Sequence, residues 1–225
     1  MAHQTADITW APGGQPVSTR FDDPYFSLQN GLEETRHVFL AGNDLAQRLT
    51  PGFTVAELGF GTGLNLLALA HLCETLDVSG VHFTSFEAYP MRASDMTTAL
   101  EAYPEVAPWA ERLMGGLAQL PAEVDMGCVR AHLIFGDARD TLPTWEGMAD
   151  AWFLDGFSPA KNPELWEPDL MGAVAAHTNP GGTFATYPAA SAVRAALADA
   201  GFAVERAPGH GRKRHMSRGR LADRP

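Results

Sequence analysis

Cysteine is scarce in this sequence of 225 residues, which contains only Cys73 and Cys128. Their spacing matches neither a metal-binding nor a redox motif, so we expect two buried free thiols and no bound metal. Long apolar runs are also missing, since none approaches the roughly 20 residues that a helix needs to span a bilayer. The first seven residues have neither the basic region nor the apolar core of a signal peptide. These absences predict a cytoplasmic protein.

Internal repeats, low-complexity tracts and interdomain linkers are absent as well. The length fits one α/β domain. A hydrophobic content of 45% with 19% charged residues is typical of a globular chain. We expect an N-terminal β-hairpin and helix, residues 1–50, to pack on a core formed by residues 51–225. A helical insertion is expected at residues 90–128, because this segment is longer than a simple connection between strand and helix requires.

Positive charge is in short supply, and the formal net charge is −11. The density of positively charged residues is highest at the C-terminal end. Residues 201–225 carry seven Arg and Lys side chains and two carboxylates, whereas the preceding 200 residues carry a net charge of −16. A basic end on an acidic body is typical of a contact surface for phosphate groups. It is equally typical of a solvated tail without a partner, and charge alone does not decide between the two.

A glycine-rich turn at residues 57–65 organises the rest of the chain. A short apolar run of β-favouring residues precedes it and a run of helix formers follows it, which predicts a strand, a turn and a helix. Glycine lets a ligand approach the backbone closely, and the free N–H groups of the following helix point toward that ligand. The spacing is Gly-x-Gly-x-Gly, with Leu64 at the position of the third glycine of a dinucleotide-binding fingerprint. The alternative is a turn that serves only packing.

With an acidic residue two positions before its first glycine, this turn resembles the first motif of class I S-adenosylmethionine-dependent methyltransferases. In that family the acidic residue lies near the methionine part of the cofactor, and the glycines make room for it. The resemblance implies that the cofactor is bound by Glu57, Gly59, Phe60, Gly61, Thr62, Gly63 and Asn65.

Strands and helices alternate to the end of the sequence, which predicts a mostly parallel sheet. A helix is expected over residues 32–40, restarting as far as Leu49, and a second helical piece of the insertion is expected at residues 110–114. A sharp turn is expected at residues 179–182, before the fifth strand. The predicted fold class is α/β, Rossmann-like and typical of class I methyltransferases. We expect a mostly parallel seven-stranded sheet with an N-terminal β-hairpin and a helical insertion.

Three strand-like runs are each followed by a carboxylate: residues 81–86 by Glu87, residues 129–135 by Asp137, and residues 149–154 by Asp155. Glu87, at the end of the second strand, is placed to accept hydrogen bonds from two ribose hydroxyls. In class I methyltransferases an Asp at the position of Asp137 bonds the adenine amino group. The alternative for Asp137 is an N-cap of the following helix, a role that Asp fills well.

Asp155 is the candidate catalytic residue, because a buried strand delivers it into a loop rich in Gly and Pro, residues 156–163. Amine methyltransferases often place an acidic or amide residue there, followed by prolines and an aromatic residue. The alternative is an ordinary turn Asp. The aromatic and acidic segment at residues 21–27 fits either a loop that closes over a ligand or a plain connector. Tyr25 is its candidate substrate contact.

Several stretches together resemble the methyltransferase half of the MnmC family, from the N-terminal hairpin to the basic end. They are residues 21–27, 30–40, 59–65, 153–163 and 209–214. In that family a separate FAD-dependent domain removes carboxymethyl from the wobble uridine of certain tRNAs, and the methyltransferase domain then methylates the exposed aminomethyl group. The resemblance implies S-adenosyl-L-methionine as cofactor and the anticodon loop of tRNA as partner. Since 225 residues leave no room for the FAD domain, we expect a separate FAD-dependent oxidoreductase or another source of the amine.

The same resemblance suggests how the substrate is held. Asp155 would orient the amine and take up its proton, and Phe157 would stack on the splayed-out base. The candidates for contacts with backbone phosphates are Lys161, Arg212, Lys213 and Arg214.

Three alternatives remain at the level of sequence. A class I methyltransferase acting on a small-molecule or protein amine would have the same glycine turn. An NAD-dependent oxidoreductase is disfavoured by Leu64. A non-catalytic RNA-binding module is disfavoured by the intact set of glycines and acidic residues.

Overall fold

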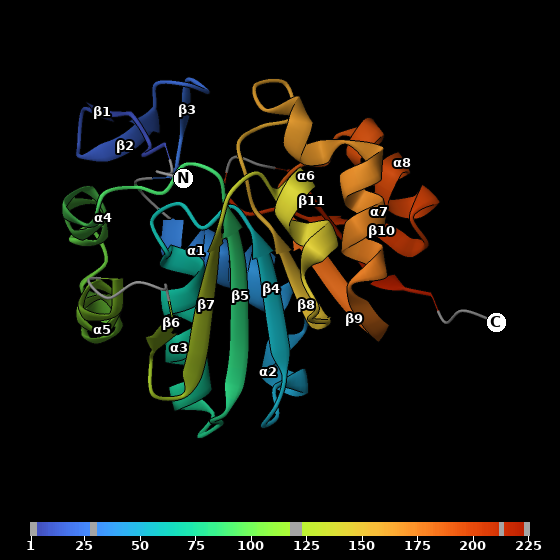
Figure 1. Cartoon of the computed structure of the whole chain (residues 1–225), viewed down its shortest axis with the longest axis horizontal. Helices are drawn as coiled ribbons and strands as arrows, with labels where there is room; N and C mark the ends of the chain where they lie inside the picture. The colour runs from blue at the N-terminus through green and yellow to red at the C-terminus, as the bar shows by residue number, and fades with distance from the viewer. Residues whose placement is uncertain (1–3, 28–30, 118–122, 212–213, 223–225) are drawn as a thin grey trace.

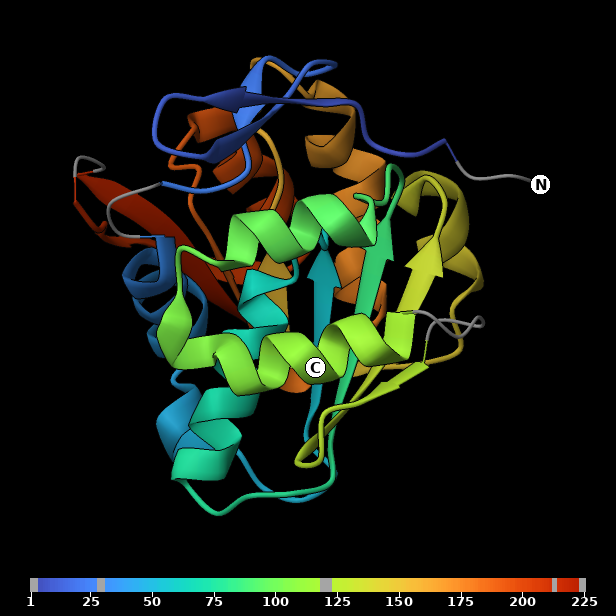
Figure 2. The same ribbon diagram turned by 90° about the vertical axis from the view of Figure 1, so that its left-hand side faces the viewer.

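The computed structural model of the chain describes residues 4–27, 31–117, 123–211 and 214–222. An eight-stranded sheet stands in the middle, between two layers of helices (Figure 1). Helices α3, α4 and α5 lie on one side, with α4 and α5 crossing in front of the sheet in Figure 2, and α6, α7 and α8 lie on the other. In the described part of the chain no helix is long and apolar enough to cross a membrane.

The strands of the central sheet are β4 (Thr54–Leu58), β5 (Val81–Glu87), β6 (Glu123–Asp125), β7 (Val129–Phe135), β8 (Ala149–Leu154), β9 (Thr178–Thr186), β10 (Phe202–Pro208) and β11 (His215–Leu221). The α-helices are α1 (Gly31–Thr35), α2 (Leu45–Arg48), α3 (Leu64–Thr75), α4 (Ala93–Leu100), α5 (Ala107–Leu117), α6 (Ala138–Thr141), α7 (Pro168–Ala176) and α8 (Ser191–Asp199). Short 3₁₀ turns are η2 (Pro104–Val106), η3 (Leu142–Thr144) and η4 (Pro163–Trp166).

The strand order is β10-β11-β9-β8-β4-β5-β7-β6. Strands β4, β5, β7, β8 and β9 are parallel, and the others join antiparallel. From β4 the chain builds outward through β5 and β7, and then returns to place β8 on the other side of β4. The loops after β4 and β8 therefore leave the sheet in opposite directions, which opens a crevice between them at the carboxyl edge.

Both faces of the sheet are buried, which explains the nearly continuous apolar runs of its central strands. Along β4 and β8 the side chains alternate between two cores. Val55 and Phe153 face the layer with α3, whereas Ala56, Trp152 and Leu154 face the layer with α7 and α8. The central strands are thereby fixed in register, and the residues at their carboxyl ends are fixed with them.

A separate three-stranded sheet is formed by β1 (Ile8–Ala11), β2 (Gln15–Ser18) and β3 (Asp23–Pro24). It contains the predicted hairpin and lies above the carboxyl ends of the central strands in both ribbon views (Figures 1 and 2). The N–H of Ala6 donates to the carbonyl of Pro90 at 3.0 Å, which ties this sheet to the segment after β5. The N-terminal segment thus forms a roof over the crevice.

The sheet differs from the prediction at two places. It has eight strands rather than seven, because the segment predicted as a helical insertion contributes β6, whose three residues carry too little pattern to reveal a strand. The sharp turn predicted at residues 179–182 is wrong, since these residues belong to β9. The pairing of β8 with β9 is irregular there, and Gly181 has a φ of +70°. The strand accommodates the glycines in this way.

The helix predicted at residues 32–40 is present but divided. It begins as α1 and continues as a π-helix, η1 (Arg36–Ala41), in which the N–H of Gly42 donates to the carbonyl of His37 at 3.1 Å. Hydrophobic periodicity does not encode such a change in hydrogen bonding. The restart is confirmed as α2.

Two smaller predictions also needed correction. Helix α5 begins at Ala107 rather than Ala110, with Pro108 in its first turn, where a missing N–H costs no hydrogen bond. Both cysteines are free, but only Cys73 is buried, whereas Cys128 is partly exposed.

Candidate active site

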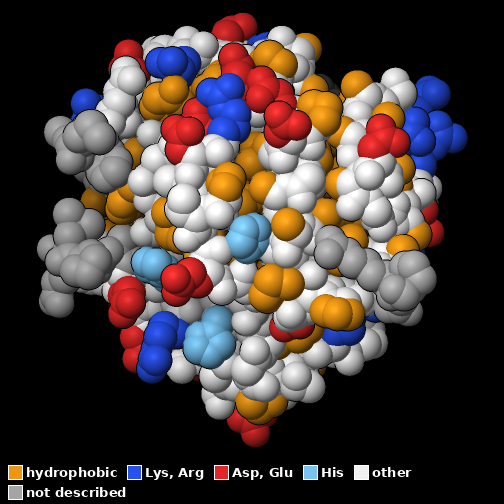
Figure 3. Space-filling view, turned by 45° about the vertical axis from the view of Figure 1, so that its right-hand side comes forward, with side chains coloured by type: hydrophobic (Ala, Val, Ile, Leu, Met, Phe, Trp, Pro, Cys, Tyr) orange, Lys and Arg blue, Asp and Glu red, His pale blue; other side chains and the backbone are white. Residues whose placement is uncertain are grey.

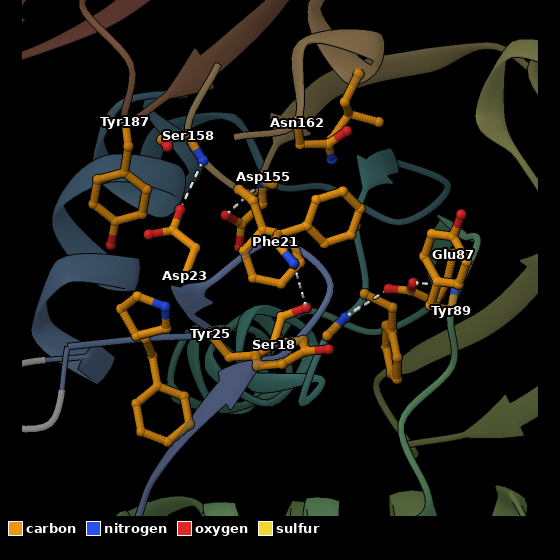
Figure 4. Close-up of a pocket in the computed structure, with 18 of the residues that line it drawn as sticks. Ser18, Phe21, Asp23, Tyr25, Glu87, Tyr89, Asp155, Ser158, Asn162 and Tyr187 are labelled. Atoms are coloured by element: carbon orange, nitrogen blue, oxygen red, sulfur yellow. Dashed lines mark hydrogen bonds between the residues drawn. The ribbon is translucent and has the colours of Figure 1, made fainter. Parts of the chain in front are cut away.

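A cavity of about 1120 Å³ opens at the crevice between the loops after β4 and β8. Its wall is made by the N-terminal segment, the glycine turn, the end of β5, and the loops after β8 and β9. Figure 4 shows Asp23, Asp155 and Tyr187 toward one side of this cavity, and Glu87 with Tyr89 toward the opposite side. We name these the Asp155 end and the Glu87 end.

The glycine turn is confirmed as a turn between β4 and α3, and its backbone requires glycine. Gly59, Gly61 and Gly63 have φ values of +86°, +54° and +80°, which other residues rarely adopt. A Cβ on Gly59 would lie 2.5 Å from the backbone oxygen of Asp155, so the absence of a side chain lets the loops after β4 and β8 touch. A Cβ on Gly61 would approach the ring of Tyr25 to 3.2 Å. Of the predicted cofactor residues in this stretch, Phe60, Thr62 and Asn65 line the cavity with Gly59 and Gly61, while Gly63 lies behind them.

Glu87 links the end of β5 to the glycine turn. Its carboxylate accepts the N–H of Gly61 at 3.0 Å and that of Tyr89 at 2.7 Å. Burial raises the pKa of Glu87, and these backbone hydrogen bonds oppose the shift. The guanidinium of Arg20 lies 4.5 Å from the centre of the Tyr89 ring, which closes this end of the cavity.

Asp137 lines the cavity and is also the N-cap of α6, so the helix-capping alternative is realised. Its carboxylate accepts the backbone N–H of Arg139 at 2.9 Å and the guanidinium of the same residue at 2.7 Å. The hydrogen bond with Arg139 lowers the pKa of Asp137. A capping role does not exclude contact with a ligand, because the residue still faces the cavity.

Asp155 is fixed at the carboxyl end of β8 by backbone and side-chain hydrogen bonds. One carboxylate oxygen accepts the N–H of Gly156 at 2.9 Å, and the other accepts the side-chain amide of Asn65 at 2.8 Å. The amide oxygen of Asn65 accepts the hydroxyl of Thr35 at 3.0 Å, which fixes the orientation of the amide group. Asp155 therefore points into the cavity with a defined geometry.

Glu57 lies beneath Asn65 and is fully buried. Its two oxygens accept the side-chain amide of Asn65 at 2.8 Å and the hydroxyl of Ser85 at 2.6 Å. Burial holds the pKa of Glu57 well above its usual range, and the negative charge of Asp155 adds to this shift. Glu57 is not among the residues that line the cavity, so the described contacts give it a supporting position behind Asn65.

An aromatic cluster covers the cavity above Asp155. The rings of Phe21 and Phe157 stack with centres 4.8 Å apart, and Tyr25 meets Phe157 edge-on at 5.0 Å. All three residues line the cavity. Burial raises the pKa of Tyr25. Of the two alternatives for residues 21–27, the structure shows a segment that covers the cavity and not a plain connector.

Lys161 occupies a different environment from the one predicted. Its ammonium group bonds the backbone oxygen of Asp22 and lies 3.3 Å and 3.7 Å from the carboxylates of Asp22 and Asp23. The other oxygen of Asp23 accepts the N–H of Ser158 at 2.9 Å. Lys161 therefore joins the loop after β8 to the N-terminal roof, with its charge already matched by two carboxylates.

The basic end is only partly described. Arg214 is exposed, and its neighbours Gly211 and His215 line the cavity, whereas Arg212 and Lys213 lie outside the described residues. Arg218 forms an ion pair with Asp44 at 3.5 Å. On the face shown in Figure 3, positive and negative side chains are interspersed over the surface. The β10–β11 connection nevertheless places Arg214 next to the rim of the cavity.

Sequence reasoning missed two residues of the Asp155 end. Glu34 is buried and lines the cavity, and its carboxylate faces the hydroxyl of Tyr187 at 3.5 Å. Burial raises the pKa of Tyr187, and the charges of Glu34 and Asp155 add to the shift. Glu34 stands in the acidic first turn of a helix, a position with an ordinary explanation, and Tyr187 follows the last parallel strand. Only the strand order brings them together.

Comparison with known proteins agrees with this geometry. The family of S-adenosyl-L-methionine-dependent methyltransferases matches residues 104–222. A relative from Chromobacterium violaceum, named tRNA 5-methylaminomethyl-2-thiouridine biosynthesis bifunctional protein MnmC, is 44% identical over all of this chain and 36% of its own length. The protein of the same name from Pseudomonas aeruginosa is 45% identical over 96% of this chain and 35% of its own. The chain thus spans about a third of the length of these relatives.

Solved structures show the same architecture over a larger share of the matched protein. The crystal structure of MNMC2 from Aquifex aeolicus matches 99% of this chain and 72% of its own, with a TM-score of 0.74 and 27% identity. A methyltransferase from Pyrococcus furiosus, 15% identical with a TM-score of 0.52, shares the fold. The predicted resemblance is confirmed: the chain belongs to the family of S-adenosyl-L-methionine-dependent methyltransferases and takes that compound as its cofactor.

Proposed function

We propose that the chain transfers a methyl group from S-adenosylmethionine to the aminomethyl group of 5-aminomethyl-2-thiouridine at the tRNA wobble position, giving 5-methylaminomethyl-2-thiouridine. The observation that carries this proposal is the 44% identity, over the whole chain, to a protein named for the biosynthesis of that nucleoside. The likeness to MNMC2, which extends over 72% of that chain, supports it. A cavity with a carboxylate at one end suits an amine as methyl acceptor.

The Glu87 end of the cavity suits the cofactor. The glycine turn has positive φ values, is bonded to Glu87 through the N–H of Gly61, and presents Gly59 and Gly61 to the cavity without side chains. We assign the adenosine part to Glu87 and Asp137, and the remainder to Phe60, Thr62 and the glycines at the start of α3. When bound, S-adenosylmethionine supplies an electrophilic methyl group on a sulfonium sulfur.

Asp155 is proposed to prepare the amine. An alkylamine has a pKa of about 10.4 and arrives as an ammonium ion, which has no lone pair for attack. The carboxylate of Asp155 can accept a hydrogen bond from this group, orient it and take up its proton, directly or through water. Asn65 and the N–H of Gly156 hold the carboxylate in place while this happens. Such alignment contributes up to about 7–11 kcal/mol in well-oriented reactions.

The aromatic cluster is proposed to receive the base. A wobble base must leave its stack to reach a cavity, and aromatic side chains are the usual surface for a splayed-out base. Phe157 is the member that stands in the same loop as Asp155, so a base in contact with Phe157 would place its 5-substituent near the carboxylate. Tyr25 and Phe21 complete the apolar wall.

The rest of the anticodon loop is proposed to lie on the basic end, with Arg212, Lys213 and Arg214 in contact with phosphates. An FAD-dependent oxidoreductase is proposed as one source of the aminomethyl substrate. We do not assign a phosphate contact to Lys161, because its ammonium group already pairs with the carboxylates of Asp22 and Asp23.

Methyl transfer from labelled S-adenosylmethionine to two matched tRNA pools tests the proposal. One pool carries aminomethyl wobble uridine and the other carries carboxymethylaminomethyl wobble uridine. We expect label in the first pool alone. Label in neither pool, with cofactor binding intact, would contradict the tRNA substrate and favour a small-molecule or protein amine. A rise in melting temperature with S-adenosylmethionine but not with NAD would distinguish a methyltransferase acting on either kind of substrate from an oxidoreductase.

A further inference from the structure

We propose that Glu34 is a second carboxylate of the amine subsite and determines the preference of the enzyme for a positively charged methyl acceptor. This inference rests on the proposed function, and it goes further by assigning the charge recognition to a residue outside the cofactor and catalytic loops.

Glu34 is built into the wall of the Asp155 end. It lies in α1, its residue is only 7% exposed, and it lines the cavity. The next residue, Thr35, bonds Asn65, which in turn bonds Asp155. The same turn of helix therefore places one carboxylate in the cavity and fixes the support of the other.

Tyr187 connects the two carboxylates. Its hydroxyl lies 3.5 Å from Oε2 of Glu34, and its ring packs edge-on against Phe39 with centres 5.4 Å apart. Burial is the main cause of the raised pKa of Tyr187, but the negative charges of Glu34 and Asp155 both contribute. Figure 4 shows Asp155 and Tyr187 toward the same side of the cavity, so the hydroxyl that faces Glu34 lies at the Asp155 end.

Glu34 differs from other carboxylates near it, which form ion pairs with Lys or Arg. Asp23 pairs with Lys161, Asp137 pairs with Arg139, and the adjacent Glu33 pairs with Arg36 at 2.6 Å. Within the described ranges no salt bridge reaches Glu34. A buried carboxylate in this position gains most from a ligand that brings a positive charge with N–H donors.

An ammonium ion fits that requirement, and a neutral or carboxylated substituent does not. Two carboxylates around one ammonium group supply acceptors for its donors and offset its loss of hydration. A hydroxymethyl group of similar size brings no charge, and a carboxymethyl group brings a negative charge toward Glu34 and Asp155. Because hydrogen bonds to charged groups are the strong ones, loss of the Glu34 charge should reduce discrimination by about 10-fold.

Binding of two nucleosides to the full chain tests this assignment. In saturating S-adenosylhomocysteine, the dissociation constants of 5-aminomethyl-2-thiouridine and 5-hydroxymethyl-2-thiouridine are measured for the wild type, Glu34→Gln and Glu33→Gln. We expect the wild type to prefer the amine. Glu34→Gln should lose about 10-fold of this preference, whereas Glu33→Gln, which removes the exposed neighbouring charge, should keep it. Glu34→Asp retains the charge and should restore part of the preference.

Each outcome decides one of the two proposals. Equal binding of the two nucleosides by the wild type, or an unchanged preference in Glu34→Gln, overturns the role of Glu34. Failure of the wild type to methylate aminomethyl tRNA, with the nucleoside preference intact, overturns only the proposed tRNA reaction. The dissociation constant of S-adenosylhomocysteine and the melting temperature report folding. If Glu34→Gln fails to fold, Glu34→Met replaces it, because it also removes the charge and keeps a side chain of similar length, and an unchanged preference there overturns the assignment.

Discussion

Asn65 shows how single side chains connect the parts of this site. Its amide donates to two carboxylates, Glu57 and Asp155, and its oxygen accepts from Thr35. The amide thus separates two acidic groups and holds each at a fixed distance. Its resemblance to a cofactor-binding position predicted that Asn65 lies in the site, but the pairing with Asp155 joins residues that are 90 positions apart. No local pattern reveals such a contact.

The side chain of Asp155 is predicted to act in methyl transfer rather than in cofactor binding. Asp155→Asn keeps the size of the side chain but removes the acceptor for the proton of the ammonium group. We expect the methylation rate to fall by about 10²- to 10⁴-fold, the range usual for a lost general base. The dissociation constant of S-adenosylmethionine, measured by calorimetry, should stay within a few-fold of wild type. Asp169→Asn, an exposed carboxylate at the start of α7, is the control. Normal turnover in Asp155→Asn would remove this residue from the mechanism.

The buried carboxyl of Glu57 predicts a pH dependence of stability. Burial raises its pKa in the folded chain above the ordinary value of about 4.3 that it has when unfolded. Between these two values the folded state binds one proton more than the unfolded state, so stability falls as pH rises through this window. Below about pH 4 the contribution is constant, because the group is protonated in both states.

Glu57→Gln removes this titration and can still bond Ser85 and Asn65. We therefore expect the difference in unfolding free energy, wild type minus variant, to decrease by up to about 1.4 kcal/mol per pH unit above pH 4. Urea unfolding at several pH values measures it. Glu111→Gln, an exposed carboxylate of α5, controls for the loss of one negative charge. A difference that does not change with pH would contradict a raised pKa.

Among the helices, strands and turns, the sequence predicts those that neighbouring residues determine. It does not predict those that depend on contacts with distant segments of the chain. The turn after β4, the strand that ends at Glu87 and the strand that precedes Asp155 follow from short apolar runs and glycine placement, and they are confirmed. The π-helix η1 and the short edge strand β6 are set by tertiary packing and pairing with β7, so periodicity does not show them. The same holds for the roof, whose contacts with the loop after β8 link residues about 135 positions apart.

Lys161 tests whether the roof and the loop after β8 act together. Exposed ion pairs contribute about 0.2–1 kcal/mol, so Lys161→Gln should lower stability by no more than that. Because Lys161 and Ser158 both tie the loop of Asp155 to the roof, we expect a lower kcat, by less than the roughly 100-fold associated with a 1 Å misplacement. The salt dependence of the KM for tRNA should not change.

Arg92→Gln is the matched control, since it removes a partly exposed ion pair with Asp95 in α4, away from the loop after β8. It should lower stability to a similar degree and leave kcat unchanged. A reduced salt dependence in Lys161→Gln would instead support the phosphate contact that the sequence predicted.

At the scale of the whole molecule, the uneven charge is visible in the sequence, but its placement is not. The net charge of −11 hides a positive C-terminal end, and the strand order brings that end back beside the cavity. Strands β10 and β11 pair antiparallel, so the connection between them lies at the same edge as the glycine turn, with Gly211 and His215 on the cavity wall. A basic segment next to an acidic cavity can hold phosphates outside while the cavity holds an ammonium group inside.

The basic end and the cavity are predicted to bind different parts of the substrate. The triple substitution Arg212→Gln, Lys213→Gln and Arg214→Gln should raise the KM for tRNA and leave the dissociation constant of S-adenosylmethionine unchanged. For single-stranded nucleic acid each lost phosphate contact lowers the slope of log affinity against log salt by about 0.7, so three contacts would lower it by about 2. Arg92→Gln with Arg130→Gln, a pair of exposed charges outside the basic end, should change neither KM nor slope. An unchanged slope in the triple variant would contradict a role of the basic end in binding phosphates.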